Sequence, residues 1–393
     1  MQTWWVFHTS RLMATPPSRP TRYNQDMHVS GDTLPANAVD PMAVSSRPTT
    51  GRNVVAVTGA TGHLGNVLVR ELLTRGVRVR ALIPPGEDTT PLAGMDVEMF
   101  TADVRDLGSL VLALQGVDIV YHLGGIVTIS AGMRRLLWAV NVEGTKNVAG
   151  ACLQQRVRRL IYTSSVHAFV EPPHGECITE DTPIDPERVL GDYAASKAAA
   201  TLALREQWKR GLDLVVCYPS GIIGPYDYRP SEMGRLILEV AGGGLKAYVD
   251  GAYNFVDVRD VAAGLLAAAD HGLSGEGYIM AGHIVPVYDF LELAAKMTGV
   301  TPPRTRIPPR LARTVGFLSP YYYRVVGQQP LFTSYSMDVL RSNCEMSHNK
   351  AERELGFRSR PLHNTVEDTI RWFRRTGRIP VNAKRRGASA ANK

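Results

Sequence analysis

Cysteine is scarce in this sequence of 393 residues. The four cysteines lie far apart, no two of them form a C-x-x-C pair, and no histidine spacing beside them suits zinc. This pattern argues against a zinc site or any other metal site, and it favours a reducing compartment.

Long apolar runs are also absent. A membrane-spanning helix needs about 18 or more consecutive apolar residues, whereas the longest charge-free stretches, at 53–69 and 119–133, are shorter and are broken by glycine. Hydrophobic residues make up 44% of the chain and charged residues 21%, which is typical of a globular protein with two or three domains. We predict a soluble, cytoplasmic protein without a membrane span.

Acidic residues are missing from residues 371–393, which carry eight lysines and arginines. Residues 1–52 are also basic, so the formal net charge of +7 comes from the two ends and the body between them is slightly acidic. A basic excess confined to tails is more typical of solubility than of recognition, so we expect no nucleic-acid partner.

Apolar periodicity is lacking in residues 1–50, which are rich in Pro, Ser, Thr and Arg and are predicted to be disordered. The apolar stretch at 4–7 is too short for a secretory signal. An Arg/Ser-rich start without an acid before Asp26 is typical of a transit peptide, so organellar targeting by residues 1–40 stays open. An upstream mis-set start codon explains the segment equally well, because further methionines follow at Met13, Met27 and Met42.

Strands and helices alternate along residues 53–275, which predicts an α/β fold with a doubly wound parallel sheet, the Rossmann fold. We expect a Rossmann domain over 51–275, with 219–258 also contributing to the substrate site, a smaller substrate-binding lobe over 276–380 and a basic tail over 381–393. The predicted strands are 53–58, 77–83, 96–100, 117–121, 158–163 and 212–217, and the predicted helices are 63–75, 106–115, 133–153, 192–210, 259–270 and, near the end, 335–342, 348–355 and 362–376.

A glycine-rich loop joins the first strand to the first helix. Residues 54–57 are β-branched or small, and apolar positions recur at helical spacing from His63 onward. Gly59 permits a tight turn, Gly62 lets a pyrophosphate approach the backbone, and Gly65 allows close helix packing. The G-x-x-G-x-x-G spacing has a first gap one residue longer than the common dinucleotide fingerprint, and a glycine triplet by itself is weak evidence because it also occurs in simple turns. Its place between a strand and a helix predicts a nucleotide site at the helix N-terminus.

Strand ends are the positions where a doubly wound sheet holds its ligands. His122, at the end of the fourth strand, is more typical of a packed histidine than of a base. Asp103 and Val104 follow the third strand, where they can bond an adenine edge or cap the next helix. Leu123, Gly124 and Gly125 follow the fourth strand, and the two glycines there have no side chains, so a ribose can approach the backbone.

A serine, a tyrosine and a lysine form the predicted catalytic group. Tyr193 and Lys197 are four residues apart and share one helix face, and Ser165 follows the fifth strand. The pKa of a tyrosine is about 10 in peptides, and a neighbouring ammonium lowers this pKa. Ser165 can hold a substrate oxygen for proton exchange with Tyr193 while hydride moves to or from nicotinamide. A Y-x-x-x-K pair is also common on helix surfaces, but it occurs here in the right order after a glycine loop.

Several motifs together resemble the extended short-chain dehydrogenase/reductases: VTGATGHLG, ADV, YHLGG, NVEGT, YTSSV, YAASK, PSGIIGP and NFVDVRDVA. The chain looks similar to the branch with dihydroflavonol reductase, 3β-hydroxysteroid dehydrogenase-like proteins and hopanoid-associated sugar epimerases, over about residues 53–300. The resemblance implies Ser165, Tyr193 and Lys197 as catalytic residues and leaves Asn141 as a residue that ties neighbouring strands. It implies cofactor contacts at Gly59, Gly62, His63, Leu64, Gly65, Asp103, Val104, Leu123, Gly124, Gly125, Tyr193, Lys197, Pro219 and Ser220.

The chain departs from this family at the end of the second strand. Pro84 stands where the branch usually has an arginine for a 2′-phosphate, NAD-preferring relatives have an acid there, and Arg78 and Arg80 lie earlier on the strand. The cofactor is therefore expected to be NAD(P), with a slight lean to NADP. Epimerases of the superfamily tend to have an asparagine at the place of Gly221, and its dehydratases carry an Asp-Glu pair at the place of Ser164–Ser165.

These contrasts predict an oxidoreductase that interconverts a ketone or aldehyde and an alcohol on a small, fairly apolar molecule. The alternatives are a nucleotide-sugar epimerase or dehydratase and a non-catalytic NAD(P)-binding protein. A homodimer and a peripheral contact with a membrane surface both stay open. In the stretch 307–326, prolines and the tyrosines 321–323 are typical of ordinary packing, and they also fit a lid over an apolar substrate.

Overall fold

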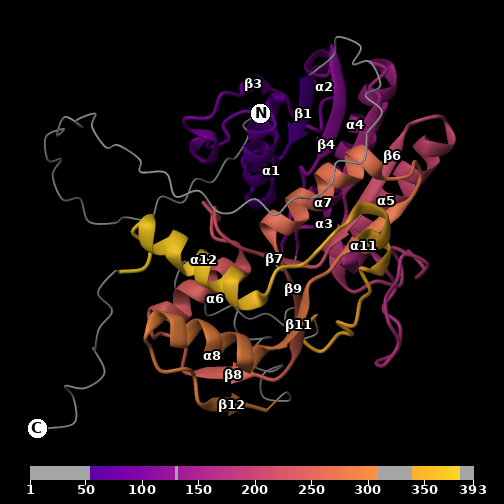
Figure 1. Ribbon diagram of the computed structural model, residues 1–393. Helices are drawn as coiled ribbons and strands as arrows, with labels where there is room; N and C mark the ends of the chain where they lie inside the picture. Colours follow the sequence, from indigo (N-terminus) through magenta and orange to yellow (C-terminus); the bar gives the residue numbers. More distant parts are fainter. Residues whose placement is uncertain (1–53, 129–131, 309–338, 381–393) are drawn as a thin grey trace, which may run out of the picture. The chain divides into compact units, whose positions relative to one another are not determined.

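The computed structural model describes residues 54–128, 132–308 and 339–380 (Figure 1). The predicted disorder of residues 1–50, the basic tail, nearly all of the predicted lid at 307–326 and most of the predicted helix at 335–342 lie outside these ranges.

Seven parallel strands form the central sheet, in the order β10-β6-β5-β4-β1-β2-β3. The strand order reverses between β1 and β4, which is the position where a doubly wound sheet opens a crevice for ligands. The predicted parallel α/β sheet is therefore confirmed. Its strands are β1 (Val54–Thr58), β2 (Arg78–Ile83), β3 (Glu98–Thr101), β4 (Val117–His122), β5 (Arg159–Thr163), β6 (Leu214–Pro219) and β10 (Gly277–Met280).

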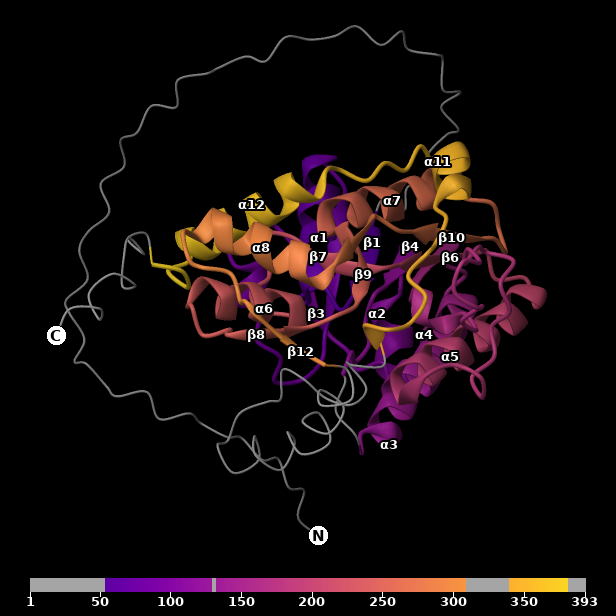
Figure 2. The ribbon, with the colours of Figure 1, turned by 90° about the horizontal axis from the view of Figure 1, so that it is seen from below.

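Helices cover both faces of this sheet because its strands are apolar on both sides (Figure 2). Val55 and Val57 of β1 pack in one apolar cluster with α1 (His63–Thr74) and α7 (Val258–His271). Val54 and Ala56, with the opposite orientation, pack in a second cluster. Its helices are α2 (Leu107–Ala113), α4 (Gly144–Gln154) and α5 (Gly191–Lys209).

The long helix predicted over 133–153 is interrupted. It consists of α3 (Arg134–Leu137), a π-helical segment η2 (Trp138–Glu143) and α4. Single π turns inside helices often occur at functional sites, and this one carries Asn141, whose side chain makes hydrogen bonds with the backbone of Ile126, after β4. The other short helical turns are η1 (Thr90–Leu92) and η3 (Val166–Ala168).

A second group of elements, which we call the C-terminal lobe, gathers beside the sheet (Figure 1). Phe255, Phe290 and Phe373 belong to its own apolar core. The lobe contains a three-stranded sheet of β7 (Gly221–Ile223), β9 (Ala252–Asp257) and β11 (His283–Pro286), a pair of β8 (Ala247–Val249) and β12 (Thr305–Ile307), and the helices α6 (Glu232–Ala241), α8 (Val287–Thr298) and α12 (Leu362–Arg375).

The chain passes between the sheet and the lobe more than once. β7 to β9 belong to the lobe although they precede residue 276, whereas β10 returns to the seven-stranded sheet. The later helix α11 (Asn349–Leu355) packs on α7 and β10. The lobe is therefore assembled from separated segments, and no single residue divides it from the sheet. No helix within the described ranges is both long and apolar enough to cross a bilayer.

Candidate active site

The glycine loop between β1 and α1 has the geometry that a pyrophosphate needs. Gly59 has φ +67°, and a Cβ there would lie 2.8 Å from the Gly124 nitrogen. A Cβ on Gly65 would lie 2.0 Å from the Gly59 oxygen, so both positions require glycine. Gly62 caps α1 without a side-chain hydrogen bond, which leaves the first N–H groups of the helix, from His63 onward, available to an anion. The residues present fit a dinucleotide.

Side chains around the end of β4 hold the neighbouring backbone in place. Thr58 Oγ1 accepts a hydrogen bond from the Gly124 N–H at 2.9 Å and lies 2.7 Å from His122 Nδ1. His122 is fully buried, its Nε2 lies 2.9 Å from Thr145 Oγ1, and burial lowers its pKa to about 3. The interpretation of His122 as a packed strand-end histidine is confirmed.

Asn141 supports the same strand end from the π-helical segment. Its Oδ1 accepts from the Ile126 N–H at 2.8 Å, and its Nδ2 donates to the Ile126 carbonyl and to Ser196 Oγ, both at 3.0 Å. A Cβ on Gly125 would meet Asn141 Oδ1 at 3.1 Å and Lys197 Nζ at 3.5 Å. Asn141 thus joins the loop after β4 to α5, which is more than the strand-tying role expected for it.

Asp103 and Val104 follow β3, which is the strand at one edge of the seven-stranded sheet. The Asp103 carboxylate bonds Arg105, and this partner lowers its pKa. The helix cap that we considered for Asp103 is instead made by Asp106, which accepts from the Gly108 N–H at 2.9 Å. The adenine contact stays a prediction.

The three predicted catalytic residues come from two neighbouring elements. Ser165 follows β5 and is 6% exposed, while Tyr193 and Lys197 lie in the first two turns of α5. Lys197 is 5% exposed, and its Nζ donates to the Thr163 carbonyl at 2.8 Å. This bond fixes α5 against the end of β5, so Tyr193 and Ser165 meet there.

The pKa of Tyr193 differs from the sequence expectation. We expected the Lys197 ammonium to lower it, but burial raises it to about 12, a hydrogen bond with Ser165 offsets part of that rise, and Glu232 raises it further. Burial also lowers the pKa of Lys197 to about 8. Desolvation therefore outweighs charge in this site, and Tyr193 is a neutral phenol at pH 7.

His167 is a site residue that the sequence analysis missed. Its backbone N–H donates to Ser165 Oγ at 3.2 Å, and its ring lies 6.5 Å from the Tyr193 ring. His167 Nε2 lies 2.8 Å from Tyr253 Oη of β9 in the C-terminal lobe. Burial lowers the pKa of His167 to about 4, so the imidazole is neutral at pH 7. Its position two residues after Ser165 was the sequence signal that could have indicated His167 as a site residue. The contact between His167 and Tyr253 exists only in the folded chain.

One cavity of about 450 Å³ joins these groups. Apolar side chains line its lobe side, among them Met233, Leu236 and Phe290. Asp103, Val104 and Gly124 do not line it. The predicted residues that do line it are Gly59, Gly62, His63, Leu64, Gly65, Leu123, Gly125, Ser165, Tyr193, Lys197, Pro219 and Ser220.

The model of the NAD dependent epimerase/dehydratase family matches residues 55–281, more than half of the chain. The chain belongs to this family. The resemblance to the extended short-chain dehydrogenase/reductases is thereby confirmed, and the match covers the glycine loop, Ser165, Tyr193 and Lys197.

Known members of the family align with most of the chain. Sterol demethylase protein B of Methylococcus capsulatus is 38% identical over 325 residues, which are 82% of this chain and 99% of that protein. A putative dihydroflavonol 4-reductase of Synechocystis is 30% identical over 82% of this chain and 95% of its own length. The crystal structure of a nucleoside-diphosphate-sugar epimerase from Pseudomonas aeruginosa is 28% identical, covers 83% of this chain and 99% of its own, and has a TM-score of 0.69.

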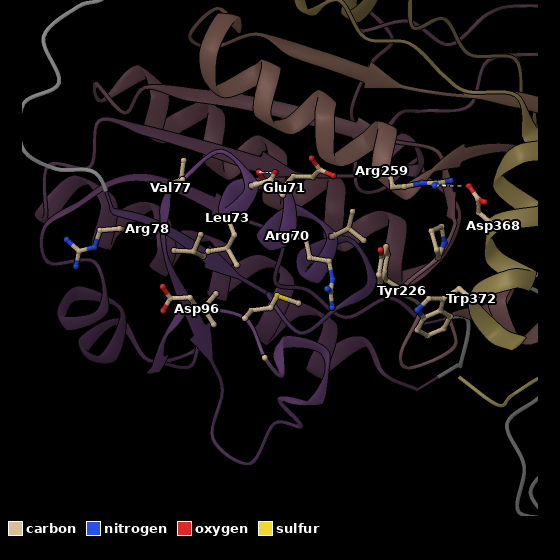
Figure 3. A pocket seen from close by; sticks show the side chains of 18 of the residues that line it. Arg70, Glu71, Leu73, Val77, Arg78, Asp96, Tyr226, Arg259, Asp368 and Trp372 are labelled. Carbon is tan, nitrogen blue, oxygen red and sulfur yellow. Dashed lines mark hydrogen bonds and ion pairs between the residues drawn. The ribbon is translucent and has the colours of Figure 1, made fainter. Parts of the chain in front are cut away.

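This chain also has a larger hollow, of about 1030 Å³, between α1, the start of β2 and α12 (Figure 3). Arg259 pairs there with Asp368 at 2.8 Å. Arg70 donates to Tyr228 Oη at 3.1 Å and lies over the Tyr226 ring. None of the predicted site residues lines the described part of this hollow, so the smaller cavity is the one that combines the glycine loop with Ser165, Tyr193 and Lys197.

Proposed function

We propose that the chain is a nicotinamide-dependent oxidoreductase that interconverts a ketone and an alcohol on a small, fairly apolar molecule. The observation that carries this proposal is the meeting of Ser165, Tyr193 and Lys197 in a cavity that has the glycine loop on one side and an apolar lobe wall on the other. The C-terminal lobe is then the substrate-binding part of the protein.

Tyr193 is suited to give its proton to a substrate oxygen. Burial raises its pKa to about 12, so the phenol is protonated at pH 7 and holds the proton that the substrate oxygen takes up when a ketone is reduced. The Ser165 oxygen accepts from the His167 N–H, which leaves the Ser165 hydroxyl hydrogen for the substrate oxygen or for Tyr193. A bound nicotinamide supplies the hydride for the carbonyl carbon, or takes it in the reverse direction.

Lys197 holds its position through Thr163 and lies beside Gly125, at the end of β4. An ammonium with a pKa near 8 keeps a charge at neutral pH and still exchanges protons readily. We assign to Lys197 the ribose hydroxyls of the cofactor and the resupply of the proton that Tyr193 gives up.

The substrate is proposed to be apolar and ring-shaped, as for a dihydroflavonol or a 3β-hydroxysteroid. Two relatives carry sterol demethylase and dihydroflavonol reductase names, which supports this class. Along the described wall of the cavity, Arg235 is the cation contributed by the lobe, and the side chains around it, such as Met233 and Leu236, suit an apolar substrate better than a nucleoside diphosphate.

A nucleotide-sugar epimerase is the second candidate, supported by the Pseudomonas aeruginosa structure. Gly221 argues against it. A Cβ on Gly221 would lie 2.2 Å from Tyr253 Cε1, so the ring fills the space where an epimerase asparagine would stand.

A substrate panel separates the two candidates. Steroids, flavonoid-like ketones, simple aldehydes and UDP- or dTDP-sugars are incubated with NAD(P)H or NAD(P)⁺. We expect a stoichiometric change of NAD(P)H absorbance with an apolar ketone or alcohol. Sugar interconversion without net cofactor change would establish the epimerase and contradict the proposal.

A further inference from the structure

The end of β2 lacks the polar residue expected there. In doubly wound folds, a residue at this place recognises the 2′ position of the adenosine ribose. An acidic side chain binds the 2′-hydroxyl of NAD, and an arginine binds the 2′-phosphate of NADP. β2 ends at Ile83, and the next residue, Pro84, offers neither. The cofactor preference therefore depends on which other side chain reaches the position.

A turn brings Glu87 back to the strand end. The Glu87 N–H donates to the Pro84 carbonyl at 3.2 Å, and Gly86 has φ +76° at the third position of the turn. Proline followed by a glycine with positive φ is typical of a type II turn. Because this turn reverses the chain, Glu87 lies next to Pro84 although it is three residues further along.

The Glu87 carboxylate also contacts the glycine loop. Thr61, which precedes Gly62, donates its hydroxyl to Glu87 Oε1 at 3.2 Å. The carboxylate thus lies between the end of β2 and the loop that fits the pyrophosphate, which is the span that the adenosine ribose bridges. The Glu87 side chain is 25% exposed, so the carboxylate remains accessible.

Arg229, from the C-terminal lobe, fixes this arrangement. It forms an ion pair with Glu87 and donates to the Thr61 carbonyl at 3.1 Å and to Thr61 Oγ1 at 2.9 Å. Arg80 is engaged elsewhere, since it donates to the Ala113 carbonyl at 2.7 Å and pairs with Glu98 at 3.0 Å. The Arg229 guanidinium is therefore already paired with the Glu87 carboxylate, and the Arg80 guanidinium is bound at Ala113 and Glu98.

We propose that Glu87 is the residue that selects the cofactor, by accepting a hydrogen bond from the 2′-hydroxyl of NAD, and that Arg229 positions its carboxylate against Thr61. A 2′-phosphate would face the carboxylate and would have to break the Glu87–Arg229 pair before the arginine could bind it. The chain therefore prefers NAD over NADP, which reverses the expectation drawn from Pro84. This inference rests on the proposed nicotinamide-dependent function.

Equilibrium binding of the two dinucleotides tests it without any substrate. Dissociation constants of NAD⁺ and NADP⁺ are measured by calorimetry on the full chain. We expect the wild type to bind NAD⁺ at least about tenfold more tightly. Glu87→Gln should reduce this preference at least about tenfold, because NAD⁺ loses its acceptor and Arg229 is released toward the phosphate.

Asp88→Asn is the matched control. It removes the same charge from the next residue, whose carboxylate bonds the Thr90 N–H at 2.9 Å and the Thr90 hydroxyl at 2.6 Å. We expect it to leave the preference within about twofold. Equal effects of the two substitutions would mean that only the overall charge matters, and would overturn the proposal.

The remaining outcomes are also decisive. A wild type that prefers NADP⁺ and loses that preference in Arg229→Gln would assign the selection to Arg229 and overturn the role of Glu87. Binding of both dinucleotides without preference would overturn the inference and leave the proposed function standing. Binding of neither dinucleotide would contradict the proposed function itself.

Discussion

Lys197 is expected to lower the stability of the folded protein at neutral pH. Burial lowers its pKa from 10.5 to about 8, so the ammonium form is less favourable in the folded chain than in the unfolded one. At pH values well below 8, this shift lowers the free energy of unfolding by about 3 kcal/mol. Between pH 8 and 10.5 the unfolded chain binds more protons than the folded chain, so the stability rises with pH in this window.

The variant Lys197→Met removes this titration and keeps an unbranched side chain. We expect the stability difference, which is the free energy of unfolding of the variant minus that of the wild type, to be about 2 kcal/mol larger at pH 7 than at pH 9.5. Urea denaturation of both proteins at the two pH values measures the difference. The control is Lys209→Met, in the last turn of the same helix, whose ammonium donates to Glu206 at 2.7 Å with 62% of its side chain exposed.

The control difference should change by less than about 0.5 kcal/mol between the two pH values. If the difference for Lys197→Met were equally independent of pH, the ammonium would be well solvated and the reasoning would be refuted. The variant should also lose turnover, because the ammonium that costs stability is the group to which we assign the cofactor ribose and the resupply of the Tyr193 proton.

Three further expectations concern other parts of the chain. Tyr193→Phe should abolish turnover and leave the dissociation constant of the cofactor nearly unchanged, because it removes a proton donor and little contact area; a variant with most of its activity would contradict the role of Tyr193. Gly221→Asn should displace the Tyr253 ring, which lies 2.2 Å from the new Cβ position, and should raise the KM for an apolar ketone about tenfold or more with cofactor binding retained; unchanged kinetics would show that the ring moves freely. Deletion of residues 1–50 should leave the melting temperature and the cofactor affinity unchanged, as expected for a segment that buries little apolar surface; a drop of several degrees would show that it packs on the fold.

The sheet and the glycine loop follow from local sequence. β-branched runs, helical periodicity and three glycines act over short distances, so β1, α1 and the loop between them are predicted within one or two residues. The Tyr193–Lys197 pair is local too, since one helical turn brings the two residues together. Strands of the lobe such as β7 and β8 have three residues each, too few to show a period, and they were missed.

Contacts between distant segments were beyond the sequence. Glu87 and Arg229 are separated by 142 positions, and His167 and Tyr253 by 86. Nothing in either pair's local pattern indicates its partner, because the contact exists only once the lobe packs beside the sheet. The raised pKa of Tyr193 was missed for the same reason, since burial is a property of the assembled site and not of the Y-x-x-x-K spacing.

The π-helical segment Trp138–Glu143 has a consequence for how the helix before α4 tolerates length changes. A π turn accommodates one residue more than an α turn, and one residue corresponds to a rotation of about 100° around the helix axis. Loss of a single residue from this segment would restore a continuous α-helix and turn Asn141 away from Ile126 and Ser196. The extra residue of this segment therefore sets the rotation of the helix that carries Asn141. A one-residue deletion there should disturb the hydrogen bonds of the loop after β4 more than most substitutions on the helix surface.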